Sequence, residues 1–490
     1  MRLTCGFWIG LAAVVAGVFS DDDAACAQTV FYVDVDADAE PHDGSTWCHA
    51  FLDLQQALTA ASNSQLKYEI RVAGGTYKAG APPSTLQSFR LKSGVAVYGG
   101  FAGCGAADSD ERNLILYETV LSGDLLDDDD PTPSSNCCSA NGTQTCDVSD
   151  CATAVCAERL SCCNSEWDEL CGAAARVLCC GPCGNRCDNT KQILRGDSAD
   201  GTAVLDGFTI TGGNANGPNP RDRGGGYYST FIAPSRPVIR NCVFRGNAAL
   251  AKGGAMANER SDVQLINCLF VDNVSKEAGA IYNSTSAPRL ENCTASENVA
   301  YVKQGGIENN IDDSPAIINS ILWRNQDASG MGESAQINFT IGTTLTLNYS
   351  CVQGLTGDLG GVGNVSDDPL FVDPDGVDGL VGTSDDDFRL NPASPLIDRG
   401  DPLHPPSPCE TDLDLESRVE AGRIDLGSFE DGSAAPPQDA NLDLGDFASF
   451  QQCIGAASLI PCLCAHDADG NGVVEVSDLA GFIAAFTGPS

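Results

Sequence analysis

The 490-residue sequence is poor in basic residues. It contains 27 lysines and arginines against 67 aspartates and glutamates, which gives a formal net charge of −40 at pH 7. Nucleic acids and anionic membranes bind positively charged surfaces, so this balance argues against both as partners. Two interpretations of the acidic excess remain, a solvated acidic exterior or calcium binding, because the acids cluster in Asp/Gly-rich loops.

Long apolar runs are also scarce. One occurs over residues 6–19, after Arg2 and before a small-x-small cleavage site at residues 25–27. We interpret residues 1–27 as a secretory signal peptide. A lipoprotein anchored at Cys26 is the alternative, although Asp23 stands where an apolar residue would be expected. No later segment is long and apolar enough to span a membrane, so we expect a secreted or cell-surface protein without a transmembrane segment.

The middle of the chain lacks a 3.6-residue apolar period, which argues against a helical or leucine-rich repeat. A longer pattern recurs instead over residues 225–325, with spacings of 26, 25 and 27 residues. Each unit carries an Asn (Asn241, Asn267, Asn292, Asn319) and, six residues later, a second Asn (Asn247, Asn273, Asn298, Asn325). A period in the twenties is typical of a solenoid, whose units bury their apolar faces by stacking.

The phase of the pattern indicates which solenoid this is. The residue two before the first Asn is apolar (Ile239, Leu265, Leu290, Ile317), as on an inward strand face. After the Asn the alternation shifts by one residue. The inward positions are now the first residue after the Asn, which is small (Cys242, Cys268, Cys293, Ser320), and the third (Phe244, Phe270, Ala295, Leu322). Such a slip requires a bend, and Asn tolerates the left-handed conformation. We therefore predict an all-β, right-handed parallel β-helix with three short strands per coil, an Asn amide ladder at the bend and buried, inert thiols.

Two sets of residues carry a family resemblance. Phe244-Arg-Gly-Asn247 and Phe270-Val-Asp-Asn273, each followed by Gly-Gly-Ala-Met or Ala-Gly-Ala-Ile, resemble the repeats of polymorphic outer-membrane proteins and the wider pectate-lyase-like β-helix class. The closing segment, with Arg423-Ile-Asp-Leu-Gly-Ser-Phe-Glu430, resembles bacterial surface β-helix proteins of the choice-of-anchor type. The resemblance implies the fold and a surface location more than any one activity.

The predicted organisation follows from these signals. Residues 28–126 form an N-terminal cap, with a helix near 51–58, and the first coils, in which Ile70, Val95 and Val120 recur every 25 residues. Residues 191–365 are further coils, residues 366–432 the C-terminal end of the β-helix and residues 433–438 a linker. Cys48 and Cys104 are a candidate disulfide pair in the first unit.

A cysteine-rich insertion is predicted at residues 127–190. Twelve of the 24 cysteines lie between Cys137 and Cys187, and no histidine lies among them. Cys180-Gly-Pro-Cys183 has zinc-ligand spacing. The even count, the missing histidine and the predicted export favour a disulfide-stapled unit that protrudes from one coil.

The last segment, residues 439–490, carries the strongest motif. The loop that begins Asp467-Ala-Asp-Gly-Asn-Gly472 places calcium ligands at EF-hand positions: Asp467, Asp469, Asn471, the Val473 carbonyl, Glu475 and Asp478. It resembles a type I dockerin, which implies a cohesin-like or cell-envelope partner. The first half departs from that pattern, since Ala435 and Pro437 stand at ligand positions; one calcium is expected rather than two, and cohesin binding is in doubt.

A second acidic loop offers weaker calcium candidates. Its carboxylates are Asp373, Asp375, Asp378, Asp385 and Asp387. Several hard oxygen ligands in one loop suit calcium, and a solvated acidic loop is the alternative.

Two classes of function fit the sequence. We favour a structural, adhesive or carbohydrate-binding surface protein with a calcium-binding docking module. The alternative is a polysaccharide lyase or glycoside hydrolase, which needs convergent carboxylates or an arginine or lysine base. The outward charged residues Arg240, Glu259, Asp262, Glu291 and Glu308 are scattered along the coils, and Asp206, Asp312 and Asp313 are the remaining catalytic candidates.

Overall fold

The computed structural model describes residues 29–430 except for the gaps 62–66, 131, 133–134, 180, 231–234, 311–313, 341, 404–410 and 419–422. The predicted signal peptide, linker and EF-hand-like segment lie outside the described residues.

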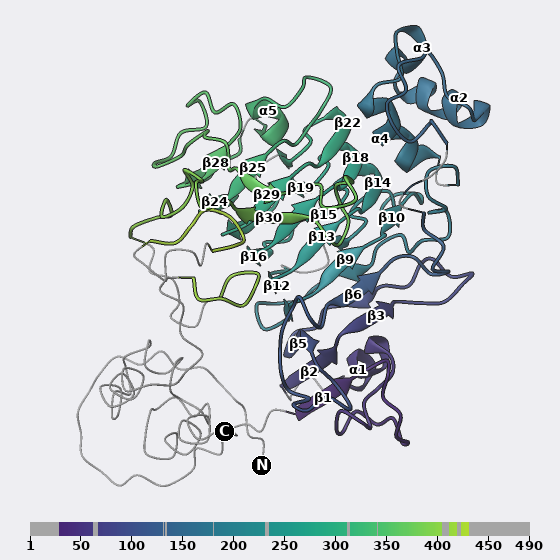
Figure 1. Cartoon of the computed structure of the whole chain (residues 1–490), viewed down its shortest axis with the longest axis vertical. Helices are drawn as coiled ribbons and strands as arrows, with labels where there is room; N and C mark the ends of the chain where they lie inside the picture. The colour runs from purple at the N-terminus through teal and green to yellow at the C-terminus, as the bar shows by residue number, and fades with distance from the viewer. Residues whose placement is uncertain are drawn as a thin grey trace.

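The described chain winds into a parallel β-helix whose strands stack in four parallel sheets (Figure 1). Sheet A contains β1 (Thr29–Val33), β2 (Tyr68–Ala73), β5 (Val95–Phe101), β8 (Val204–Asp206), β12 (Val238–Arg240), β16 (Gln264–Ile266), β20 (Arg289–Glu291), β24 (Ala316–Ile318) and β27 (Thr346–Asn348). Sheet B contains β3 (Gly75–Lys78), β6 (Thr119–Ser122), β9 (Thr209–Thr211), β13 (Val243–Arg245), β17 (Leu269–Val271), β21 (Thr294–Ser296), β25 (Ile321–Trp323) and β28 (Cys351–Val352). The predicted parallel β-helix is confirmed.

The other two sheets complete each coil. Sheet C contains β4 (Phe89–Arg90), β7 (Leu194–Arg195), β11 (Tyr227–Ser229), β15 (Met256–Glu259), β19 (Ile281–Ser284), β23 (Ile307–Asn310) and β26 (Ile337–Phe339). Sheet D contains only β10 (Asn214–Ala215), β14 (Ala248–Lys252), β18 (Val274–Glu277) and β22 (Val299–Lys303). The prediction of three strands per coil is therefore wrong for the coils that carry sheet D.

The interior is a column of apolar side chains in register. Ile239, Leu265, Leu290 and Ile317 pair across sheet A and are buried. In sheet B the rings of Phe244 and Phe270 stack with centroids 5.0 Å apart. The inward phase read from the sequence on both sides of the Asn bend is thus confirmed.

The bends adopt the predicted left-handed backbone. Asn241, Asn267, Asn292 and Asn319 all have φ between 50° and 53°. The longest amide ladder, however, runs through the second Asn of each unit rather than the first. Its side chains link Asn247 to Asn273 (3.1 Å), Asn273 to Asn298 (2.9 Å) and Asn298 to Asn325 (2.8 Å). These amides are fully buried, so each must find its partners within the stack.

The register of the first coils differs from the prediction. Ile70 of β2 pairs with Val97 rather than Val95, and Val120 belongs to sheet B, where it pairs with Thr76. The 25-residue spacing of Ile70, Val95 and Val120 is therefore not a structural repeat. The cap is present: α1 (Leu54–Ala60) buries Leu54 and Leu58 against the open end of the apolar column.

The cysteine-rich unit does not protrude freely from the β-helix. It contains α2 (Ser149–Glu158), α3 (Ser161–Asn164) and α4 (Glu169–Leu178), and α4 lies against β14, β18 and β22 of sheet D (Figure 1). Ala248, Val274 and Tyr301 of that sheet belong to the same buried cluster as the unit's own core. The predicted disulfide-stapled insertion is present, and its α4 packs on the β-helix because sheet D presents an apolar outer face that the unit covers.

The described residues from Phe371 onward form a segment that crosses the outer face of sheet B. It includes the antiparallel pair β29 (Phe371–Asp373) and β30 (Asp387–Leu390). Its Phe388 and Leu413 pack on Leu269 and Val271 of β17. We refer to residues 371–430 as the strap. Its described residues add no parallel strand to the stack and instead shield apolar side chains on the outside of the coils.

Candidate functional site

A groove of about 310 Å³ lies between the strap and the outer face of sheet B. Three stretches far apart in sequence form it: residues 114–119, the outward residues of β9, β13 and β17, and strap residues 383–389, 413–414 and 429. A concave site built from several segments and lined by both polar and apolar groups is the usual location of ligand binding.

Ion pairs fix the polar lining of the groove. Arg389 forms a two-pronged pair with Asp414 (Nε to Oδ2, 2.6 Å; Nη2 to Oδ1, 2.8 Å) and donates from Nη1 to Asp387 (3.1 Å). Across the groove, Arg245 Nη2 lies 3.2 Å from Glu118 Oε1, which also accepts from the Thr209 hydroxyl at 2.7 Å. These contacts hold donors and acceptors in place before any ligand arrives.

Apolar groups form the rest of the lining. Leu269 and Val271 of β17 lie beside Leu413 and Phe429 of the strap. The Arg389 guanidinium lies over the Phe429 ring, 5.2 Å from its centroid. One end of the groove thus combines an aromatic surface with a fixed fork of N–H donors.

Asp386 is the carboxylate of the lining that burial affects most. Desolvation raises the pKa of Asp386 to about 6, although its carboxylate accepts from the Gly382 amide at 2.6 Å and from the Thr383 hydroxyl at 3.3 Å. The carboxyl is therefore largely charged at neutral pH.

The structure places the catalytic candidate Asp206 in a buried ion-pair cluster. It pairs with Arg112 (2.7 Å) and Arg240 (2.6 Å), and Oδ1 also accepts from Asn241 Nδ2 at 3.0 Å. Both oxygens are engaged, which suits a brace between neighbouring coils. The other two candidates, Asp312 and Asp313, lie outside the described residues.

The other outward acidic residues named from the sequence also have partners. Glu291 pairs with Arg289 at 2.9 Å and Asp262 with Arg236 at 3.2 Å. Glu259 pairs with Arg223 and accepts from the Tyr228 hydroxyl, and Glu308 pairs with Lys303 at 3.4 Å. The described coils hold these carboxylates apart in separate pairs.

The acidic loop of the strap is closed by its own hydrogen bonds. Asp385 Oδ2 accepts from the amides of Val377 and Asp378, and Oδ1 accepts from the Thr383 hydroxyl at 2.6 Å. Asp387 faces Arg389. Calcium binding here stays a prediction, as it does for Asp467, Asp469, Asn471, Val473, Glu475 and Asp478, which lie outside the described residues.

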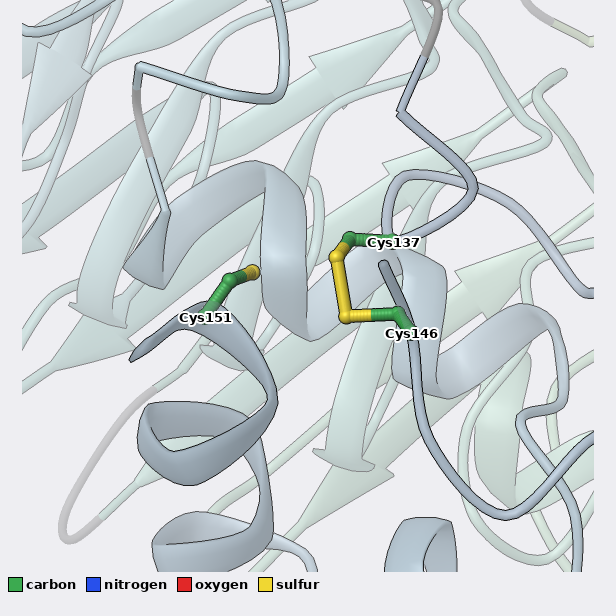
Figure 2. Close-up of side chains that lie close together, drawn as sticks. All are labelled: Cys137, Cys146 and Cys151. Atoms are coloured by element: carbon green, nitrogen blue, oxygen red, sulfur yellow. A yellow bond between two sulfur atoms is a disulfide. The ribbon is translucent and has the colours of Figure 1, made fainter. Parts of the chain in front are cut away.

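The cysteines of the insertion form disulfides. The described pairs are Cys137–Cys146, Cys138–Cys183, Cys151–Cys179, Cys156–Cys163 and Cys162–Cys171. Figure 2 shows the Cys137–Cys146 bond beside Cys151, three sulfurs within 4.8 Å of one another. Because each is already bonded to another sulfur, the disulfide interpretation holds here against a zinc cluster.

The predicted Cys48–Cys104 pair and the predicted buried thiols of the coils fall on described residues. Cys48 and Cys104 are joined by a disulfide, while Cys242, Cys268 and Cys293 are free and buried. The set of disulfides is compatible with an oxidising compartment. In the part of the chain that is described, no helix has the length and apolar character needed to cross a membrane.

Sequence reasoning missed the groove. Arg245 lies in the Phe244–Asn247 repeat, which indicates only the fold, and the strap brings it to Glu118, Arg389 and Asp414 across up to about three hundred residues of chain. The one available signal was outward placement of Arg245, two residues before the second Asn of its unit.

Comparisons with known proteins add little to this geometry. No family model and no curated protein matches the chain. Among solved structures, the chain resembles "Crystal structure of pectate lyase Pel9A" at 13% identity with a TM-score of 0.36, over 83% of this chain and 97% of that chain. At this level of similarity the assignment of the fold depends on the sheets of the protein itself.

Proposed function

We propose that this is an exported β-helix protein that binds a polysaccharide in the groove between sheet B and the strap without cleaving it. The lining of the groove carries the proposal: it sets ion-paired Arg389 and Arg245 beside the apolar Leu269 and Phe429. Sugars present hydroxyl edges and apolar C–H faces, and such a surface is complementary to both.

The proposal includes a docking role for the C-terminal segment. Residues 467–478 would bind one calcium ion, and the folded segment would attach the β-helix to a cohesin-like or cell-envelope partner. The predicted signal peptide and the disulfides support export to the surface. The rigid coils would then hold the groove away from the point of attachment.

The experiment is a binding panel on the full chain. Soluble neutral and anionic polysaccharides are tested by affinity electrophoresis and calorimetry, with Arg389→Gln and Arg245→Gln as groove variants. We expect at least one polysaccharide to bind and each variant to weaken it about tenfold or more, since each loses fixed hydrogen bonds to the ligand. Wild-type protein that binds none of the panel would refute the proposal.

A second candidate is a glycoside hydrolase in the same groove. Five carboxylates line it, Glu118, Asp385, Asp386, Asp387 and Asp414, and hydrolysis of a glycosidic bond needs two within reach of that bond. An assay for new reducing ends on the same panel separates the two, and unsaturated uronates would instead indicate a polysaccharide lyase. Turnover that disappears in a carboxylate variant would replace the binding role with catalysis.

A further inference from the structure

The charges of the groove are unequal. Five carboxylates but two guanidinium groups, those of Arg245 and Arg389, line it. Each guanidinium already faces a carboxylate of the protein, Glu118 for Arg245 and both Asp387 and Asp414 for Arg389. The groove therefore contains positive groups but presents no unneutralised one among its described lining residues.

We infer that the groove takes an uncharged, hydroxyl-rich glycan and excludes polyuronates and other anionic chains. This inference rests on the proposed polysaccharide binding and specifies the ligand class. It differs from what the fold alone would suggest, because it follows from how the chain pairs its own arginines.

An anionic sugar would meet two costs here. To reach Arg389 it must displace Asp414 from a two-pronged pair with contacts of 2.6 and 2.8 Å. It must also approach the excess carboxylates, whose like charge repels it, more strongly near the protein surface than in bulk water. The net charge of −40 adds a long-range repulsion of the same sign.

A neutral glycan meets neither cost. Its hydroxyls donate to the remaining lone pairs of Asp387 and Asp414 and accept from guanidinium N–H groups without breaking the pairs. The fixed pairs lose little conformational freedom on binding, because their side chains are already held in place. The apolar side chains of Leu269 and Phe429 lie beside these groups, where C–H faces of a sugar ring could pack.

The test compares neutral with anionic probes. Mixed-linkage β-glucan, galactomannan and soluble starch are measured against polygalacturonate and alginate, at low salt and in EDTA. We expect wild-type protein to bind a neutral probe at least tenfold more tightly than either polyuronate. This comparison requires no variant, so it stays informative even if a substitution impairs folding.

A charge-relief variant sharpens the test. Glu118→Gln with Asp414→Asn removes one carboxylate from each arginine and should raise affinity for hexagalacturonate about tenfold or more, with a gain that shrinks as salt increases. Asp36→Asn with Asp358→Asn is the control, because both residues are exposed and the change in net charge is the same. The control should leave affinity for hexagalacturonate unchanged.

Each outcome has a distinct meaning. Wild-type binding of polyuronates as tight as that of neutral probes, or no gain in a folded charge-relief variant, would overturn the inference while sparing the proposed function. Polyuronate binding that appears only with added calcium would also overturn it, because the acidic loop would then bind uronate through the ion. Absence of binding to every probe would refute both.

Discussion

Arg176 of the cysteine-rich unit binds Asp272 of the β-helix through both carboxylate oxygens, with Nη1 2.7 Å from Oδ1 and 2.9 Å from Oδ2. Asp272 has φ of 50° and directly precedes Asn273, a member of the interior amide ladder. One ion pair therefore ties the insertion to a bend whose backbone is held in the left-handed region.

Breaking this pair should loosen the cysteine-rich unit. Both side chains are about three-quarters buried, with 27% and 19% of their surfaces exposed, so the pair should exceed an exposed one in strength. Arg176→Met and Asp272→Asn should each lower the free energy of unfolding, with a coupling of about 1 kcal/mol in a double-mutant cycle followed by urea denaturation. Additive effects of the two substitutions would show that the pair does not hold the unit in place.

The interior ladder should be the more sensitive feature. Asn273 donates to the Phe244 carbonyl at 2.8 Å and to Asn298 at 2.9 Å, and accepts from the amide of Asn247 at 3.0 Å. Asn273→Leu would leave these buried groups unpaired, at about 1–3 kcal/mol each. We expect a loss of at least about 3 kcal/mol in urea denaturation.

Gln264→Ala is the control for the ladder, because Gln264 lies exposed on β16, outside the interior. It should change the free energy of unfolding by less than about 0.5 kcal/mol. A comparable loss in both variants would mean that the ladder adds nothing beyond ordinary strand contacts.

The free thiols should be unreactive until the protein unfolds. Burial raises the pKa of Cys242 to about 12, and Cys268, Cys293 and Cys351 are also buried. At pH 8 we expect mass spectrometry to find these four cysteines unmodified by iodoacetamide in native protein and modified in denaturant without reductant. Cys151, bonded to Cys179, should need reductant as well. Modification of the native protein at Cys268 would contradict the buried stack.

The sequence was sufficient for those parts of the fold that are set by local conformation. A left-handed bend needs a residue that tolerates positive φ, and the alternation of apolar side chains fixes which strand face points inward. The bend at Asn241 and the inward position of Ile239 can therefore be predicted without knowledge of any distant contact.

Local conformation alone does not predict which of the two Asn positions carries the longest amide ladder. Both Asn positions recur at the same spacing, and the residues before the second Asn, such as Asp272 and Glu297, also take positive φ. In two coils the first Asn forms hydrogen bonds with the strap. Asn267 donates to the Thr411 carbonyl, and Asn319 Oδ1 accepts from the Asp401 amide at 2.8 Å. Asn241 instead donates to Asp206 at 3.0 Å, so the partners of the first Asn position differ from coil to coil and depend on distant segments.

Docking of the insertion and the groove could not be predicted, for a related reason. Both depend on complementary surfaces from segments that share no motif, such as α4 against Val274 and the strap against Leu269. Periodicity predicts which side chains leave the core but not which later segment covers them.

Calcium removal tests the predicted EF-hand in the full chain. We expect EDTA to lower the temperature of a calorimetric transition assigned to residues 434–490 and to leave the β-helix transition nearly unchanged, because a ligand that binds the folded segment stabilises it. Asp467→Ala should abolish the response, while Asp446→Ala should have a smaller effect. Identical scans with calcium and with EDTA would remove the calcium assignment.

The buried carboxyl of Glu430 gives the strap a pH dependence opposite in sign to that of an ordinary acid. Its side chain is 6% exposed, and burial, with the charge of Asp425 adding to it, raises the pKa of Glu430 to about 8. Arg418 Nη1, 3.5 Å away, opposes this effect only in part.

The sign follows from proton binding. Between the unfolded value near 4.5 and about 8, the folded protein holds a proton that the unfolded chain has lost, so stability falls as pH rises through this window. We expect strap stability to decline between pH 5 and pH 8 by on the order of 2 to 4 kcal/mol, measured by limited proteolysis at residues 371–430. Glu430→Gln should flatten the decline, and the exposed Glu416→Gln should not. A decline that persists in Glu430→Gln would assign it to another group, of which Asp412, with a pKa raised to about 6 by burial, is the first to test.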